Sequence, residues 1–384
     1  MLLRELVRGF ASECHALARC QGAVLLFISG LVFYSILYPS PYLNELPQKL
    51  EFAAVDQDNS IASREILRLI GTTEGIRLKK AASRSEAAEA MKSGRIAGMM
   101  VIPRDFERRL LSGKAQSIPL YCDASHLLLY RSVLTGVQQA TGNAAATVRA
   151  AALMKRGVSK AAAASLQSAG RADVRLMYNP CGNYMLNTVP PVFVLIIQQI
   201  LMAGCGMIEA SRRKAGMPEG GLLQMAGRAL VPACLGMAFS LYYFWALAYV
   251  DDLLKPRDFG AVLLYLAPFF MASALCGHLI GRFTRSQSLV LTVVLPISVP
   301  CLFLTGCIWP AECMGEFFGT VRHLIPVTPA SNGYLMIAGR GASLSEVLPL
   351  WLEEWGQCVF LLGLSLLVER VSALRKGGAA AGAV

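Results

Sequence analysis

The sequence predicts an α-helical integral membrane protein that has six transmembrane helices and an α/β domain with a long helical extension between helices 1 and 2. Of the 384 residues, 55% are hydrophobic and 16% are charged, whereas soluble globular proteins carry about 25% charged residues. A central apolar stretch begins at Tyr178 and has no charge before Glu209, so it exceeds the roughly 20 residues that cross a bilayer. Residues 45–175 are charged throughout and are predicted to be water-soluble.

The first 44 residues predict a surface helix followed by a membrane span. Residues 1–19 place Leu3, Leu6 and Phe10 at helical spacing with charges between them, which is typical of an amphipathic helix at the cytoplasmic membrane surface. Residues 20–44 contain no charge and end in an aromatic, proline-rich sequence. A cleaved signal peptide is the alternative, but its apolar core would be only about 7–15 residues long. We therefore predict a retained transmembrane helix 1 over residues 20–44.

The soluble domain is predicted over residues 45–175 from alternating strand and helix patterns. The predicted strands are 52–55, 76–80, 96–102 and 118–122. Helices between them imply a small α/β domain, and Ser83 with Glu86 fits a capping box. The polar sequence from Asp56 to Ser60 is better explained by a turn and a helix cap than by a ligand site. Residues 126–169 predict a long helix or helical hairpin.

The rest of the chain, residues 176–376, is predicted to hold transmembrane helices 2–6. Their expected ranges are 185–208, 229–250, 259–281, 286–308 and 347–368. Residues 377–384 are expected to form a flexible cytoplasmic tail.

The orientation follows from the lysine and arginine residues near the helix ends, which favour the cytoplasm. The basic set is Arg4, Arg8, Arg19, Arg212, Arg213, Lys214, Arg228, Arg282, Arg285, Arg370, Arg375 and Lys376. The loop 251–258 on the other side has three acids against two bases. We therefore expect both termini in the cytoplasm and residues 45–175 in the periplasm, in the inner membrane of a bacterial cell.

Catalytic and cofactor motifs are missing from the sequence. It contains no Walker A sequence, no GxGxxG after a strand, no HExxH and no GxSxG. The eleven cysteines form no CxxC pair, and the four histidines are too dispersed to predict a metal site. We expect no enzyme activity and no cofactor bound by this chain. The net charge of +11 follows from the membrane topology, so no nucleic-acid partner is expected. Whether Cys122 and Cys181 form a disulfide does not follow from the sequence.

Several sequence segments resemble ABC type 2 permeases, the membrane subunits of ATP-driven exporters, and occur in the order expected for that family. The resemblance is to the branch with a large extracytoplasmic domain after helix 1. The segments are AAVDQDNSIASREILRLI (53–70), GRIAGMMVIPRDFERRLLSG (94–113), YCDAS (121–125), YNPCGNYMLNTVPPVFVLIIQQIL (178–201), FLTGCIWPAECM (303–314) and HLIPVTPASNGYLMIAGRG (323–341). The resemblance covers nearly the whole chain.

The resemblance implies a contact with a cytoplasmic ABC ATPase, which would use ATP and Mg²⁺. The residues that match the docking loop are Glu209, Arg212, Arg213, Lys214 and Gly216, and those that match the connecting helix are Glu13 and Arg19. The family often has two glutamates before a Gly-Thr, where this chain has Arg212 and Lys214 before Gly216. Alternatively, the basic cluster Arg212, Arg213 and Lys214 only fixes the end of the helix at a membrane surface that contains anionic lipid. Family members also pair with a second permease, a copy or a paralogue, and a periplasmic adaptor is a further partner that we consider.

Four polar residues inside apolar stretches are candidates for a translocation path, namely Gln198, Gln199, Glu353 and Glu354. The glutamines alternatively hydrogen-bond to neighbouring helices, and the glutamates alternatively lie in water at the outer interface. His278 is interpreted as a satisfied buried residue.

The sequence therefore predicts a permease that exports a lipophilic or drug-like substrate. The alternative is a membrane-anchored sensor or envelope-assembly scaffold, in which the soluble domain binds a ligand and nothing is transported. Nucleotide-dependent substrate flux distinguishes these two hypotheses. The substrate's identity and the choice between homodimer and heterodimer do not follow from the sequence.

Overall fold

The chain forms two compact units, which the computed structural model describes for most residues. The units are Met1–Leu43 with Leu176–Val384, called here the membrane unit, and Asn44–Arg175, called the α/β unit. The described residues are 2–42, 50–73, 75–112, 117–125, 130, 133–138, 140–142, 153–154, 157–159, 161–162, 177–179, 184–217, 221–251, 253–284 and 286–381, with side chains up to residue 371.

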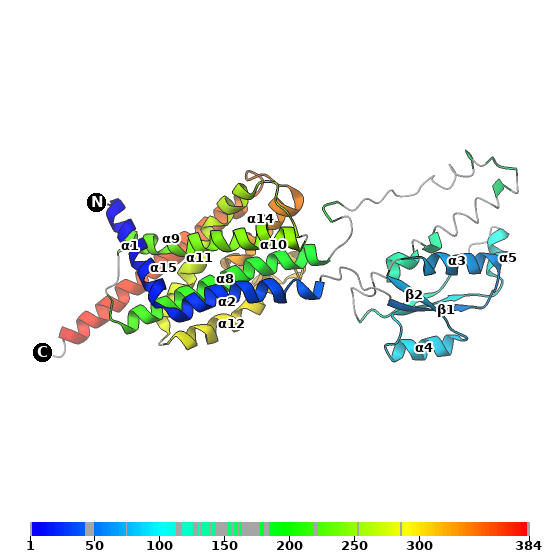
Figure 1. Ribbon diagram of the computed structural model, residues 1–384, viewed down its shortest axis with the longest axis horizontal. Coiled ribbons are helices and arrows are strands. Elements are labelled where there is room, and N and C mark those ends of the chain that lie inside the picture. The colour runs from blue at the N-terminus through cyan, green and yellow to red at the C-terminus, as the bar shows by residue number, and fades with distance from the viewer. Residues whose placement is uncertain are drawn as a thin grey trace. The chain divides into compact units, whose positions relative to one another are not determined.

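The membrane unit is helical, and its long helices apart from the first run side by side (Figure 1). The long elements are α1 (Leu2–Arg19), α2 (Gln21–Leu37), α8 (Tyr184–Lys214), α9 (Leu222–Leu241), α11 (Phe259–Phe283), α12 (Gln287–Leu304) and α15 (Leu348–Ala381). The short ones are η1 (Ser40–Tyr42), η2 (Tyr242–Ala246), α10 (Leu247–Val250), η3 (Ala311–Cys313), α13 (Glu316–Val321), η4 (Arg322–Leu324), α14 (Val327–Tyr334) and η5 (Leu335–Gly339). Five described helices are long and apolar enough to cross a membrane, or six if the bent pair α1–α2 is one span.

Three helix ends differ from the sequence prediction, two of them for local physical reasons. The segment predicted from residue 229 begins at Leu222, because Arg228 is buried within α9 and does not mark a helix end. The segment predicted to residue 308 ends at Leu304, where Thr305 caps it and Gly306 has a φ of +86°, a conformation that stops helices. Helix α15 continues to Ala381, through Gly377 and Gly378, where a flexible tail was predicted.

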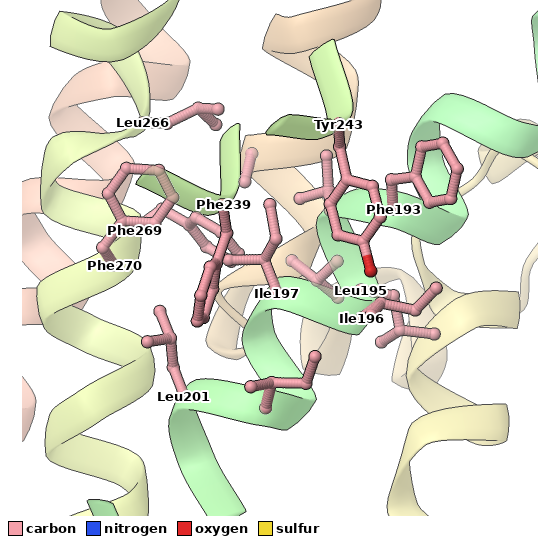
Figure 2. Packing of buried hydrophobic residues seen from close by; sticks show 14 of the residues in the cluster. Phe193, Leu195, Ile196, Ile197, Leu201, Phe239, Tyr243, Leu266, Phe269 and Phe270 are labelled. Carbon is pink, nitrogen blue, oxygen red and sulfur yellow. The ribbon is translucent and has the colours of Figure 1, made fainter. Parts of the chain in front are cut away.

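Helix α8 is the centre of the membrane unit. It packs against α11, α12 and α2, and 89% of an 18-residue apolar segment of this helix is buried. Because α8 is apolar on all sides before Glu209, it can be surrounded by other helices without leaving a charge unpaired. Figure 2 shows Ile197 and Leu201 of α8 on the side of Phe239 and Phe270, while Phe193 of α8 lies beside Tyr243, with which it stacks.

Glycines allow two pairs of helix backbones to meet closely. Gly277 and Gly281 of α11 face the backbone of α8, and a Cβ at Gly281 would collide with the carbonyl oxygen of Gly206. Gly227 of α9 likewise faces the carbonyl oxygen of Leu6 in α1. Small residues four positions apart are a common device for close packing of membrane helices.

The first two helices meet at a sharp bend. Helices α1 and α2 are separated by Cys20 alone and are inclined by 82° to one another. Helix α1 packs along α9 (Figure 1), with Gly9 against the backbone of Gln224. The amphipathic sequence of α1 therefore buries one face on protein.

The α/β unit contains the predicted four strands, β1 (Leu50–Asp56), β2 (Ile76–Lys80), β3 (Gly98–Ile102) and β4 (Leu120–Cys122). Their order is β2-β1-β3-β4, with β1 parallel to β2 and β3, and β4 antiparallel. Helices α3 (Ile61–Gly71) and α5 (Phe106–Leu111) lie on one face, and α4 (Arg84–Lys92) on the other (Figure 1). The chain steps from β1 to β2 and then back past β1, so right-handed crossovers place α3 and α4 on opposite faces.

Alternating residues of β1 explain this two-sided packing. Phe52 and Ala54 pack against the α3 face, while Ala53 and Val55 pack against the α4 face. The long helical extension predicted over 126–169 lies mostly outside the described residues, and so does Cys181 of the disulfide hypothesis.

The polar sequence after β1 consists of turn and cap residues, as predicted. The Oδ1 of Asp56 accepts hydrogen bonds from the backbone N–H groups of Asp58 and Asn59. Ser60 is the N-cap of α3, and its hydroxyl accepts from the N–H of Ser63 at 3.1 Å. Asp58 reaches further, because its two carboxylate oxygens accept from the N–H groups of Phe106 and Glu107 at 3.0 Å each. Asp58 therefore joins β1 to the start of α5.

Asp58→Asn is expected to weaken α5. Burial by itself raises the pKa of Asp58, but hydrogen bonds from Ser60 and from the first N–H groups of α5 outweigh it and lower the pKa. A lowered folded-state pKa means that the carboxylate stabilises the fold above its unfolded pKa, about 3.9, and that this contribution is lost as the pH falls through the folded value.

Hydrogen-exchange mass spectrometry of the full chain at pH 7 measures the effect of Asp58→Asn. We expect faster exchange over 106–111, equivalent to about 1 kcal/mol, and no change in Glu89→Gln, which removes an exposed acid from α4. Unchanged protection in Asp58→Asn would contradict the capping role.

Candidate functional site

A buried charge network lies at the ends of α1, α8 and α11. Its centre is the ion pair between Glu13 of α1 and Arg212 of α8, whose Oε2 and Nη2 are 2.7 Å apart. The side chains are only 1% and 6% exposed. The same Nη2 donates to the carbonyl oxygen of Ser12 at 2.8 Å. Arg212 thus holds both the side chain and the backbone of α1.

The second part of the network joins α8 to α11. Glu209 lies one turn before Arg212, and its Oε1 is 3.5 Å from Nη1 of Arg282. His278 stands between the two acids, with Nδ1 3.9 Å from Glu209 and Nε2 4.0 Å from Glu13. Arg213 also donates to the carbonyl oxygen of Arg282. The network therefore forms a chain of contacts from α1 through α8 to α11.

The sequence builds this network by helical spacing. Glu209 and Arg212 are three residues apart in α8, and His278 and Arg282 are four apart in α11, so each pair lies on one helix face. Buried ion pairs are costly when either partner is removed. A shift of α1 against α8, or of α8 against α11, would separate opposite charges in a region that excludes water. The arrangement can therefore make the movements of three helices depend on one another.

The structure divides the predicted docking residues into two groups. Glu209 and Arg212 are buried and bind neighbouring helices, so their side chains do not form an exposed docking surface. Arg213, Lys214 and Gly216 are exposed at the end of α8. Of the two predicted connecting-helix residues, Glu13 is buried, as described above, whereas Arg19 is exposed.

Sequence reasoning missed His278, Arg282 and Arg228 as members of a site. His278 is half-enclosed by the two acids, but its Nε2 has no hydrogen-bond partner among the described residues, so it is not the satisfied residue that we predicted. The spacing of His278 and Arg282 on one face of an apolar helix was the available signal. Arg228 had the appearance of a residue that marks the end of a span.

The four candidate path residues lie in different surroundings. Gln198 is 3% exposed, and its Oε1 has no hydrogen-bond partner among the described residues, while Gln199 is half-buried. Glu353 is 2.9 Å from Nδ1 of His323. Glu354 is fully buried, and neither of its carboxylate oxygens has a hydrogen-bond partner in the described part of the chain. Glu354 thus does not lie in water, which separates it from its neighbour.

No metal site is formed by the described residues, since they contain no group of three or more His, Cys, Asp or Glu side chains suited to holding an ion.

The long apolar helices indicate a multi-pass membrane protein. Residues 22–367 match the family described as ABC-2 family transporter protein, and the chain belongs to this family. It is also similar to the linearmycin resistance permease protein LnrN of Bacillus subtilis (strain 168), with 23% identity over 349 residues, which are 85% of this chain and 89% of that protein. Members of this family are transport subunits that lie in the lipid bilayer and are not themselves catalytic, and the family implies a separate ATPase partner.

Glu13→Gln is expected to destabilise the membrane unit by about 3–5 kcal/mol, because it leaves Arg212 buried without a counter-charge. The double variant Glu13→Gln/Arg212→Gln removes both charges and is expected to recover part of that loss. Thermal unfolding of the purified full chain in detergent measures both. Arg8→Gln is the matched control, because Arg8 pairs with Glu5 on the surface with its side chain 55% exposed and such pairs contribute about 0–1 kcal/mol. Equal unfolding temperatures for the single and double variants would contradict the pairing.

Proposed function

We propose that this chain is the membrane-spanning subunit of an ABC exporter, which moves a lipophilic or drug-like substrate out across the cytoplasmic membrane with ATP hydrolysed by a separate subunit. Membership of the ABC-2 family supports the permease role. The buried charge network is the observation that carries the mechanism, because it links a surface helix to two membrane helices. ATP and Mg²⁺ are bound by the partner ATPase in this proposal, and no cofactor by this chain.

The ATPase docks on the exposed end of α8, at Arg213, Lys214 and Gly216, and on α1. Movement of α1 reaches α8 through the Glu13–Arg212 ion pair, which is nearly inaccessible to water. It then reaches α11 through the contacts of Glu209 with His278 and Arg282. Glu209 and Arg212 transmit movement without docking, and Lys214 and Gly216 dock without transmitting. Arg213 does both, because it also donates to the carbonyl oxygen of Arg282.

The proposed orientation places both termini and the charge network in the cytoplasm, and residues 45–175 in the periplasm. The concentration of arginine and lysine at this end of the helices supports it. A second permease, a copy or a paralogue, completes the transporter, and the periplasmic α/β unit receives the substrate or passes it to an adaptor protein.

Efflux of a small molecule is favoured by the similarity to LnrN, whose name describes a permease that confers linearmycin resistance. Within this proposal, Gln198 and Glu354 contribute to the translocation path, since both have buried oxygens without hydrogen-bond partners in the described part of the chain. Intramembrane carboxyl groups of this kind are often functional. Gln199 and Glu353 are weaker candidates for the path. Gln199 is only half-buried, and Glu353 contacts His323, whose side chain is 57% exposed.

The second candidate is a sensor or envelope-assembly scaffold, with the α/β unit as its ligand-binding part. The four helices α9, α11, α12 and α15 that follow α8 count against it, because an anchor needs fewer spans. Affinity purification of the tagged chain from its own cells in mild detergent, followed by mass spectrometry, separates the candidates. A stoichiometric partner with a Walker A motif supports the exporter. Absence of any ATPase, even with an ATP analogue and a crosslinker present, would favour the scaffold.

Arg213→Ala/Lys214→Ala is expected to reduce ATPase recovery and ATP-dependent substrate flux at least tenfold, while the amount of protein in the membrane stays the same. The physical reason is loss of two exposed cations at the docking surface without loss of the buried Arg212. Lys255→Ala/Arg257→Ala is the control, since it removes two exposed cations from the loop on the opposite side. Unchanged recovery and flux in the first variant would exclude this docking surface.

A further inference from the structure

A small pocket that opens to solvent lies beside the charge network and is lined by residues of α8, α9, α11 and α15. One group of its lining residues is polar, namely Glu209, Arg228, His278, Arg282 and Glu369. Another group is apolar, and includes Leu275 and Leu279. The pocket is therefore amphipathic, with charges and hydrocarbon side chains side by side.

Arg228 forms no ion pair with the described residues of this pocket, although Glu209 and Glu369 also line it. The residue is only 8% exposed, and its Nε has no hydrogen-bond partner in the described part of the chain. Among the described residues, the other two arginines of the region have acidic partners, Glu13 for Arg212 and Glu209 for Arg282, but none forms an ion pair with Arg228. A buried cation without a partner is strongly unfavourable. The geometry points to an anion that comes from outside the chain.

The chemistry of the pocket selects the anion. A guanidinium group presents paired N–H donors that match two oxygens of a phosphate. The Nε2 of His278 is a further polar atom without a hydrogen-bond partner among the described residues. Leu275 and Leu279 offer a surface for hydrocarbon next to these groups. Basic pockets between membrane helices near the cytoplasmic surface are suited to lipid headgroups.

We propose that this pocket binds a membrane phospholipid, with the phosphodiester group on Arg228 and the start of an acyl chain against Leu275 and Leu279. Glu209 does not oppose the phosphate with a free charge, because Arg282 is its partner, and Glu369 has an interaction of its own. The bound lipid completes the charge balance around Arg228 and ties α9 to α11 and α15. This inference goes beyond the proposed function and does not require that the chain transports a substrate.

Native mass spectrometry of the purified full chain tests the proposal. The protein is delipidated in detergent and titrated with phosphatidylglycerol. We expect one tightly bound lipid, which raises the unfolding temperature, and at least a tenfold weaker affinity in Arg228→Gln. Arg370→Gln is the matched control, because Arg370 is an exposed arginine of α15 that does not line the pocket, and it should bind lipid like the unchanged protein.

Two further measurements make the outcome decisive. Leu279→Trp keeps Arg228 and fills the apolar part of the pocket, so it should also lose the bound lipid, and it replaces Arg228→Gln if that variant does not fold. Inorganic phosphate should neither displace the lipid nor raise the unfolding temperature. Equal lipid binding by Arg228→Gln and Arg370→Gln would overturn the proposal. An identical temperature shift with inorganic phosphate alone would overturn it too, because the ligand would then be a free anion.

Discussion

The close contact between the backbones of α8 and α11 determines where the charges of this protein meet. Gly277 and Gly281 of α11 pack directly on the α8 backbone near Gly206. Each of these glycines is close in sequence to a network residue, since Glu209 lies one turn beyond Gly206, His278 follows Gly277 and Arg282 follows Gly281. With larger residues at these positions the helices would lie further apart, and the contacts of 3.5 and 3.9 Å between their charged groups would be lost.

A charge network in such a position has a structural consequence for the helices that carry it. The Glu13–Arg212 pair is almost completely buried. Separating the two side chains would leave each charge without its partner and without water, which costs several kcal/mol of free energy. The pair therefore favours a small number of defined arrangements of α1 and α8 over a continuous range. This is the property that a coupling element between an ATPase and a membrane domain requires, and surface ion pairs such as Arg8–Glu5 do not have it.

The features that could be predicted from the sequence are those that depend on local pattern. Charge-free runs predicted the spans, and the Ser60 and Ser83 caps marked the starts of α3 and α4. The roles of Glu209, Arg212 and Arg228 depend on which neighbour each side chain faces. A charge near the end of an apolar run is equally compatible with an interfacial position and with a buried pair, so sequence alone favoured the exposed reading for all three. Glu353 and Glu354 show the same limit, since adjacent residues of one helix point in different directions and only one is buried.

The 82° bend at Cys20 gives α1 the properties of a lever. A helix of 18 residues is about 27 Å long, so turning it by about 10° around Cys20 would carry its far end through about 5 Å. Glu13 lies about a third of the way from this pivot, where the same turn produces a displacement of about 2 Å. Because Leu6 and Gly9 pack on the backbone of α9, this part of α9 would have to move with α1. A large displacement under a small force at the tip of α1 would then become a small displacement under a larger force at Arg212.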